Sequence, residues 1–325
     1  MPTAFVTGGT GFVGLNLIQE LRARGWDVTA SHRASSNLDF IRRFGPRLVV
    51  ADVVDPQAIL AAMPARPDAV FHLAASVSFW SPKNGEQTKI NVEGTRNVVE
   101  AALARKAARF IHMSSLAAWG PGDGDVIDES TPSRAPGHRV NYYRTKWLAE
   151  QEVQRGIERG LAAVFINPAH ILGPYDAGTW ARAFLLTKQH RVPCVPPGEA
   201  PFCHVRQVVL AMLAAVEKGG IGERYLLAGT QASYRELFGI VCELLGQRPP
   251  PVVPQWLLSA LAQADELLSR FTGKEPDMTP ELARVLGARF QVRSTKAERE
   301  LGFQSVPFRT MVEDTFAWLR EEHLV

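Results

Sequence analysis

Two side chains able to move and hold a proton stand one helical turn apart in this chain. Tyr142 and Lys146 are four residues apart in a segment that reads as a helix, so both project from the same face. A phenol titrates at about 10 in water, and an adjacent ammonium favours the phenolate. Tyr143 lacks this alignment with Lys146. We therefore predict Tyr142 as a general acid/base supported by Lys146.

A hydroxyl group that could hold a substrate oxygen follows an apolar strand. The segment Arg109–Met113 reads as a strand, and Ser115 comes just after it. Open α/β sheets bind ligands at the carboxyl ends of their parallel strands. Ser115 could donate a hydrogen bond to a carbonyl oxygen as negative charge grows there. Ser115 completes the predicted catalytic set.

A glycine-rich run near the start of the chain predicts a dinucleotide site. Residues 7–14 read Thr-Gly-Gly-Thr-Gly-Phe-Val-Gly, between the strand Ala4–Val6 and an amphipathic helix. Such a turn needs glycine where it is tight, where it approaches a pyrophosphate and where helix meets sheet. The helix N-terminus offers free N–H groups to the phosphates. The predicted contacts are Gly8, Thr10, Gly11, Phe12, Val13 and Gly14. An oxidised nicotinamide ring beside Tyr142 would add to the effect of Lys146 on the phenol.

The loop after the second predicted strand, Asp27–Ser31, favours NADP(H) over NAD(H). An acidic residue there would accept hydrogen bonds from a ribose 2′-hydroxyl, whereas this chain continues His-Arg-Ala-Ser-Ser. Arg33 and Ser36 can instead form a site for a 2′-phosphate. Asp52 and Val53, at the end of a third strand, are expected near the adenine. Asp52 could equally cap the helix that begins at Pro56.

Strands and helices alternate through the first half of the chain. This rhythm predicts an α/β fold, a doubly wound parallel sheet (Rossmann) with a smaller, mostly helical C-terminal substrate lobe. Further strands are expected at Ala69–Leu73, Ala162–Asn167 and Arg224–Leu227, and long helices at 85–105 and 140–159. The predicted domains are residues 1–167, with 203–229 rejoining them, and a substrate lobe of residues 168–202 and 230–325.

Composition excludes several classes of protein. The 36 basic and 33 acidic residues give a net charge of +3, so we expect no nucleic-acid surface. The three cysteines form neither a zinc motif nor a disulfide framework, which favours reduced thiols in the cytoplasm. The eight histidines are scattered, so no metal site is predicted. We find no leader and no apolar span of about 18 residues, so neither secretion nor a membrane-spanning segment is expected.

Together these features resemble the extended short-chain dehydrogenase/reductase family over nearly the whole chain. The resemblance implies that Tyr142 is the general acid/base, Lys146 orients the cofactor ribose and Ser115 polarises the substrate oxygen. It also implies a bracing role for Asn91 and a homodimer paired through the two long helices. The segments that match are 7–14, 72–75, 91–95, 114–120, 142–146, 167–174 and 222–227. By the same resemblance, the walls of the nicotinamide site are Leu73, Ala74, Ala75, Pro168 and Ile171.

The resemblance is greatest to the dihydroflavonol 4-reductase-like branch, beside the NAD-dependent epimerase-like one. It implies an NADPH-dependent reductase of a ketone or aldehyde. An NAD-dependent nucleotide-sugar epimerase and a non-catalytic dinucleotide-sensing protein stay open as alternatives. Sugar-nucleotide 4,6-dehydratases are disfavoured because residues 116–118, Leu-Ala-Ala, cannot move a proton.

Aromatic residues favour an apolar or aromatic carbonyl or alcohol substrate. A sugar diphosphate would instead need a cationic clamp, and Arg182, Lys188, Arg191 and Arg206 are expected to be solvated charges. The apolar residues of the helix from Gln255 to Phe271 are expected to pack inside the lobe. The predicted substrate pocket contains Ser76, Phe79, Trp80, Ser115, Trp119, Tyr142, His170 and Trp180.

Overall fold

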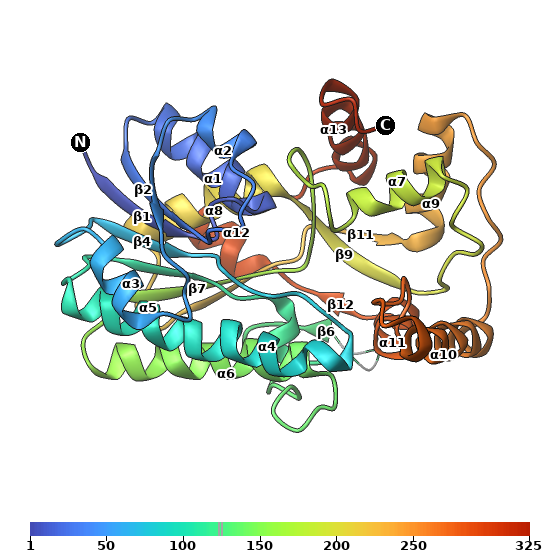
Figure 1. The fold of residues 1–325 in the computed structure, drawn as a ribbon, viewed down its shortest axis with the longest axis horizontal. Helices are drawn as coiled ribbons and strands as arrows, with labels where there is room; N and C mark the ends of the chain where they lie inside the picture. Colours follow the sequence, from blue (N-terminus) through green and yellow to red (C-terminus); the bar gives the residue numbers. More distant parts are fainter. Residues whose placement is uncertain (123, 125) are drawn as a thin grey trace.

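A seven-stranded parallel sheet forms the centre of the computed structural model, which describes residues 1–122, 124 and 126–325 (Figure 1). The strand order is β10-β7-β5-β4-β1-β2-β3. Because the chain moves outward from β1 in one direction and from β4 in the other, the switch point lies between these two strands. The strands are β1 (Thr3–Thr7), β2 (Asp27–His32), β3 (Arg47–Val50), β4 (Ala69–His72), β5 (Phe110–Met113), β7 (Ala163–Pro168) and β10 (Arg224–Leu227).

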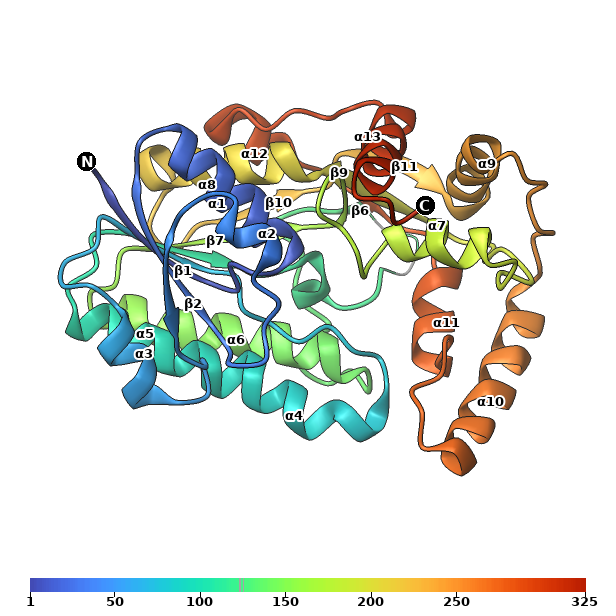
Figure 2. The same cartoon turned by 45° about the horizontal axis from the view of Figure 1, so that its top comes forward.

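Helices cover both faces of this sheet, which confirms the predicted doubly wound fold (Figure 2). One layer contains α1 (Phe12–Ala23), α2 (Asp39–Arg42), α8 (Val205–Lys218) and α12 (Thr295–Leu301). The other contains α3 (Pro56–Ala62), α4 (Asn84–Thr88), α5 (Gly94–Ala104) and α6 (Asn141–Glu158). A π-helical turn, Lys89–Glu93, joins α4 to α5, so the long helix predicted at 85–105 has a local irregularity.

Strand residues alternate between two cores because successive side chains point to opposite faces of a sheet. In β1, Ala4 and Val6 belong to the core beneath α1 and α8, whereas Phe5 belongs to the core beneath α5. Both faces are covered, so the central strands β1, β4 and β5 are mostly apolar, as expected for a buried parallel sheet. This pattern makes the first half of the chain easy to recognise.

The C-terminal half is mostly helical but also contains small sheets that the sequence did not predict. One has the order β11-β9-β8, and another pairs β12 with β6. The strands are β6 (Val126–Ile127), β8 (His170–Leu172), β9 (Glu199–His204), β11 (Thr230–Ser233) and β12 (Gln291–Val292). The helices of this half are α7 (Ala181–Lys188), α9 (Tyr234–Leu245), α10 (Gln255–Thr272), α11 (Pro280–Gly287) and α13 (Phe308–Glu321). Short 3₁₀ turns lie in the N-terminal half, at Ser81–Lys83 and Leu116–Trp119.

The prediction that the apolar residues of α10 pack inside the lobe is wrong for most of them. On its inner side Leu258 and Ala262 pack with Ala283 of α11. Its outer side faces solvent, with Trp256 70% and Phe271 82% exposed. Helical periodicity identifies an apolar face but does not supply a partner for it. Within the described residues, every helix is too short or too polar to cross a bilayer.

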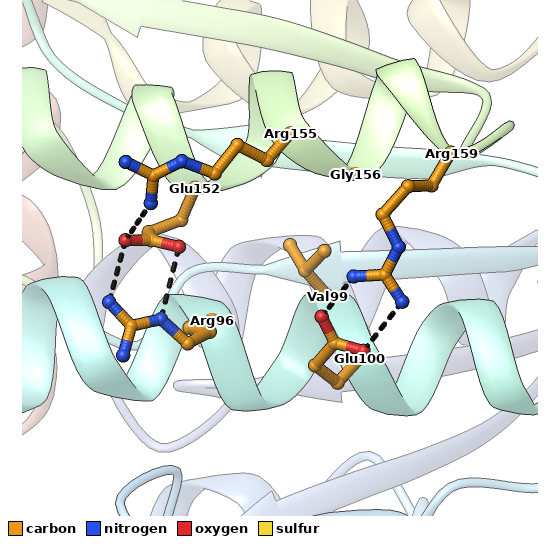
Figure 3. Close-up of a pocket in the computed structure, with 7 residues that line it drawn as sticks. All are labelled: Arg96, Val99, Glu100, Glu152, Arg155, Gly156 and Arg159. Atoms are coloured by element: carbon orange, nitrogen blue, oxygen red, sulfur yellow. Dashed lines mark hydrogen bonds and ion pairs between the residues drawn. The ribbon is translucent and has the colours of Figure 1, made fainter.

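The outer surface where α5 meets α6 carries charged pairs formed within the chain (Figure 3). Glu152 accepts hydrogen bonds from Arg96 of α5 at 2.8 Å and from Arg155 at 2.6 Å. Arg159 pairs with Glu100 along the same groove, where Arg159 Nη2 lies 2.9 Å from the carboxylate. These two helices carry the predicted dimer surface, so a second copy would meet charges that already have partners.

Candidate functional site

A cleft of about 1140 Å³ brings most of the predicted site residues together. It extends from the glycine-rich loop, past the ends of β5 and β7, to α10 and α11. The predicted residues that line it are Gly8, Gly11, Phe12, Val13, Gly14, Leu73, Ala75, Phe79, Ser115, Tyr142, Lys146, Pro168, His170, Ile171 and Trp180.

The three predicted catalytic side chains converge in this cleft. The Ser115 hydroxyl lies close enough to the Tyr142 phenol to act on its ionisation as a hydrogen-bond donor. The Ser115 Oγ also accepts from the Ala117 N–H at 3.2 Å, so its own proton is available to the phenol or to a ligand. Lys146 Nζ donates to the Met113 carbonyl at 3.2 Å, which holds the ammonium against the end of β5. This arrangement can hold an oxygen atom and give it a proton.

Burial dominates the ionisation of the catalytic pair. Burial raises the pKa of Tyr142, and the hydrogen bond from Ser115 opposes this rise. Burial also lowers the pKa of Lys146 to about 8, against the opposing effect of the Glu150 carboxylate. The expectation of a lowered phenol pKa is therefore not met by the protein groups alone. A positive charge placed in the cleft beside the phenol would act in the lowering direction.

The glycine-rich loop has the geometry that a pyrophosphate requires. Gly8 has a φ of +71° and lets the chain turn sharply after β1. Gly11 is the N-cap of α1, has no capping side chain, and no acidic residue follows in the first turn. The first N–H groups of this helix therefore face the cleft without a capping acceptor. Uncapped donors at the positive end of a helix dipole fit the phosphates of NAD(P).

Replacing Gly14 with alanine is expected to weaken NADPH binding at least about tenfold, which is about 1.4 kcal/mol. A Cβ at Gly14 would lie 2.2 Å from the Gly8 carbonyl oxygen, so the loop must move away from the helix. Fluorescence titration with NADPH measures this loss. Gly85→Ala is the matched control, because a Cβ there would meet nothing within 4 Å. Equal affinities for G14A and wild type would show that the tight approach is not needed.

The residues predicted to bind the adenosine half lie at the ends of β2 and β3, beside the glycine loop but outside the lining of the cleft. The Arg33 N–H donates to Ser36 Oγ at 3.1 Å, and the Ser36 N–H donates to the Arg33 carbonyl at 3.0 Å. Asp52 Oδ1 accepts from the Val54 N–H, whereas Asp55 caps α3. This excludes Asp52 as the helix cap.

Asn91 links the loop after β4 to α6. Its Oδ1 accepts from the Ser76 N–H at 2.7 Å, and its Nδ2 donates to the Ser76 carbonyl at 3.0 Å and to Thr145 Oγ1 at 3.1 Å. The π-helical turn places Asn91 at this point, and such turns are frequent at functional sites. Asn91 thus holds in place the loop after β4, which contains the cleft residues Ala75 and Phe79.

Some predicted site residues do not line the cleft. Trp119 is 5% exposed and packs with Leu116, Ile127 and Leu226, because the 3₁₀ turn directs its ring into the protein. Trp80 lies beneath the Lys83 ammonium at 5.9 Å from the ring centroid. The other predicted residues outside the lining are Thr10, Val53, Ala74 and Ser76.

The half of the cleft beyond Tyr142 is largely apolar and comes from distant segments. His170 packs against both Trp180 and Phe202, with ring centroids 4.8 Å and 5.2 Å away. Burial lowers the pKa of His170 to about 4, so its imidazole is neutral at neutral pH. Sequence analysis missed the remaining apolar wall, which includes Tyr234, Phe238, Leu258, Met278, Leu282, Val285 and Phe290. These residues are remote in sequence from the catalytic motifs, so no local pattern marks them.

Two cations of the cleft, Arg182 and Arg191, are exposed to solvent, as expected, and are also ion-paired. Arg182 and Arg191 both pair with Asp277, and the Arg191 contact is 2.6 Å. Within the described residues, no group of three or more His, Cys, Asp or Glu side chains is placed to hold a metal ion.

The sequence profile of the NAD dependent epimerase/dehydratase family matches residues 4–228, more than half of the chain. This chain belongs to that family. As a family member it is an NAD(P)-dependent enzyme of the extended short-chain dehydrogenase/reductase class.

Relatives of this family member align over nearly its whole length. Sterol demethylase protein B of Methylococcus capsulatus is 31% identical over 99% of this chain and 100% of its own. A Synechocystis protein provisionally named dihydroflavonol 4-reductase is 29% identical over 99% of this chain and 95% of its own. The crystal structure of gox2253 superimposes with a TM-score of 0.83 at 33% identity, covering 99% of both chains.

Proposed function

We propose that this protein is an NADPH-dependent reductase of a ketone or aldehyde carried on an apolar or aromatic body. The observation that carries the proposal is the position of the catalytic side chains. Ser115, Tyr142 and Lys146 meet in one cleft, between the glycine-rich loop and an apolar half. The same site run in reverse would oxidise an alcohol.

The proposed reaction assigns one task to each side chain. NADPH, when bound, supplies the hydride that reduces the carbonyl carbon. Ser115 donates a hydrogen bond to the carbonyl oxygen, where negative charge develops. Tyr142 gives its phenolic proton to the same oxygen. The Lys146 ammonium binds the ribose hydroxyls next to the nicotinamide and favours loss of the phenolic proton.

The preference for NADPH rests on Arg33. This side chain is exposed at the end of β2 and makes no hydrogen bond or ion pair with any residue that the structure describes. Its guanidinium is therefore available to a 2′-phosphate, which it can bind through two hydrogen bonds. No acidic residue stands at positions 31–36 to accept from a 2′-hydroxyl.

Arg33→Ala is expected to weaken NADPH binding by about 10–100-fold while NADH binding changes little, because a charge-assisted pair contributes about 1.5–3 kcal/mol. Fluorescence titration with both cofactors measures the change in selectivity. Arg47→Ala is the control, since Arg47 lies at the amino end of the neighbouring strand β3, away from the carboxyl end of β2 that Arg33 follows. An equal loss for NADPH and NADH would place Arg33 away from the 2′-phosphate.

The apolar substrate class rests on the far half of the cleft. Aromatic and aliphatic side chains make up most of its lining, beside a few charged ones, and His170 is neutral at neutral pH. Arg182 and Arg191 are already shared with Asp277, so a sugar diphosphate would have to displace that carboxylate. An apolar carbonyl compound needs no such rearrangement.

An NAD-dependent nucleotide-sugar epimerase is the second candidate, and the name of the matching family favours it. An epimerase recycles a tightly held NAD(H), whereas a reductase releases oxidised cofactor in every cycle. The third candidate, a non-catalytic dinucleotide sensor, is disfavoured because Ser115, Tyr142 and Lys146 are all present.

The deciding experiment combines cofactor titration with turnover. Purified protein is titrated with NADPH and NADH, and NADPH consumption is followed with aromatic and aliphatic aldehydes and ketones. A preference for NADPH with turnover is the expected result. Protein that arrives with bound NAD(H) and consumes no added cofactor would favour the epimerase. The cytoplasmic location and the homodimer stay predictions, and light scattering at several concentrations would test the second.

A further inference from the structure

Glu150 is a buried carboxylate to which the proposed reaction gives no task. It stands one helical turn after Lys146 on α6, and its side chain is only 2% exposed. A buried charge is destabilising unless opposite charges and hydrogen bonds compensate for it. The contacts that compensate for this carboxylate indicate what it does.

Three side chains from three neighbouring strands or their ends bind the Glu150 carboxylate. Ser114 Oγ donates to Oε1 at 2.6 Å, and Asn167 Nδ2 donates to the same oxygen at 2.7 Å. Arg224 Nε donates to Oε2 at 2.8 Å. Asn167 Nδ2 also lies 3.2 Å from the Ser115 carbonyl oxygen, which it can bind at the same time. The carboxylate therefore ties α6 to β5, β7 and β10 directly beneath the cleft.

These contacts reach both sides of the catalytic set. Ser114 precedes Ser115, so fixing its side chain also fixes the backbone that carries the Ser115 hydroxyl. Lys146 lies one turn away on the helix that Glu150 anchors, and its ammonium is held at the end of the same strand, β5. A shift of Glu150 would thus alter the distance between the serine and the lysine.

We propose that Glu150 is the positioning residue of the catalytic site: it fixes Ser115 relative to Lys146 and places a negative charge opposite the Lys146 ammonium. This inference rests on the proposed function, because it assigns Glu150 a task in the same reaction. Glu150 acts through its neighbours and does not line the cleft.

The charges around Lys146 determine in which direction a change at Glu150 shifts the pKa of Lys146. Burial lowers the pKa of Lys146 to about 8, and the Glu150 carboxylate acts against that decrease. His72 and His112 also face Lys146, but burial lowers their pKa values, that of His72 to about 3, so both are neutral at neutral pH. Tyr142 is neutral as well, because its pKa is raised. Arg224 is ion-paired with the Glu150 carboxylate at 2.8 Å, whereas Glu150 acts on Lys146 as a nearby charge.

Removing the charge of Glu150 should therefore make Lys146 lose its proton at lower pH. For Glu150→Gln we expect the pKa of Lys146 to fall by about 1 unit, the usual size of a nearby-charge effect. If the ammonium is needed for turnover, the alkaline limb of the kcat–pH profile moves down by the same amount. The kcat at neutral pH should fall about tenfold, as expected when a catalytic group is misplaced.

Two independent measurements test the expected decrease in the pKa of Lys146. The kcat–pH profile of NADPH oxidation reports the ionisation that matters for turnover. NMR titration of protein labelled with ¹³C-lysine, with the Lys146 signal assigned through Lys146→Met, reports the same ionisation without any turnover. A protein that reduces no carbonyl compound would fail the proposed function, while the NMR titration would still test the role of Glu150.

Three further variants distinguish the loss of the Glu150 charge from structural damage to the protein. Glu150→Asp keeps the carboxylate, so the pKa of Lys146 should stay within about 0.5 unit of the wild-type value even where kcat falls. Glu152→Gln neutralises another buried carboxylate of α6, which binds Arg96 and Arg155 away from the cleft, and should move neither readout. The double variant E150Q/R224Q leaves no unpaired charge and replaces E150Q if that protein does not fold.

The outcomes are decisive in each case. A lower Lys146 pKa in E150Q, with E150D and E152Q near wild type, supports the proposal. An unchanged Lys146 titration in folded E150Q, or an unchanged kcat in E150Q/R224Q, overturns it. Equal displacement of the pH profile in E150Q and E152Q also overturns it, since a general loosening of α6 would then explain the effect.

Discussion

Tyr142→Phe is expected to lower kcat by about 10²–10⁴-fold, the range of general acid–base catalysis by one side chain. Phenylalanine keeps the ring and its edge contact with Phe79, whose centroid lies 5.6 Å away, but has no proton to give. NADPH binding should change little, because the glycine-rich loop and Arg33 are untouched. The loss should therefore appear in kcat, measured by NADPH consumption with the best substrate of the panel.

A second tyrosine supplies the matched control for this substitution. The Tyr225 hydroxyl lies 2.9 Å from Glu300 on the far side of the sheet and is outside the lining of the cleft. Tyr225→Phe removes the same atom and should leave kcat near the wild-type value. Full turnover by Y142F would exclude Tyr142 as the proton donor and require another acid in the cleft.

The nucleotide-binding half could be predicted from the sequence because its signals are local. Glycines at fixed positions, short apolar strands and amphipathic helices each specify one element within a few residues. Parallel strands buried on both faces read as continuous apolar runs, so β1, β4 and β5 were found almost to the residue. The four-residue spacing of Tyr142 and Lys146 could be recognised because it, too, is a local pattern.

Most of the far half of the cleft could not be predicted because nonlocal contacts decide it. Nothing in the sequence distinguishes Trp119 from Trp180 as a pocket residue. The structure buries Trp119 in a separate cluster and places Trp180 in the cleft. Strand β9 contains Glu199, Pro201 and His204, so its composition gave no strand signal. Its pairing with β8 and β11 fixes it.

The sequence contained a sign that Glu150 is buried, which the sequence analysis did not use. An acidic residue one turn after Lys146, on the helix face that covers the sheet, must be buried once the fold is recognised. Buried carboxylates require partners, so the position of Glu150 could have suggested a polar network beneath the site. Naming Ser114, Asn167 and Arg224 as those partners required the structure.

Ser115→Ala is expected to lower kcat by about 10²–10³-fold, the usual loss for one donor to a developing oxyanion. Alanine removes the donor to the substrate oxygen and to the Tyr142 phenol. It also removes the acceptor for the Ala117 N–H, a local cap that contributes about 0.5–2 kcal/mol to stability. Turnover is therefore compared only after thermal unfolding shows that S115A is folded at the assay temperature.

Two variants distinguish the donor from the cap. Ser115→Thr keeps both the hydroxyl and the cap, so its kcat should recover to within about tenfold of wild type, or about 1.4 kcal/mol of barrier. Ser294→Ala removes a buried serine hydroxyl that accepts from the Ala228 N–H at 2.7 Å outside the cleft, and it should lose stability without losing kcat. If S115A and S294A lost turnover equally, the loss would come from stability. If S115T were as slow as S115A, the hydroxyl would not be the group that holds the substrate oxygen.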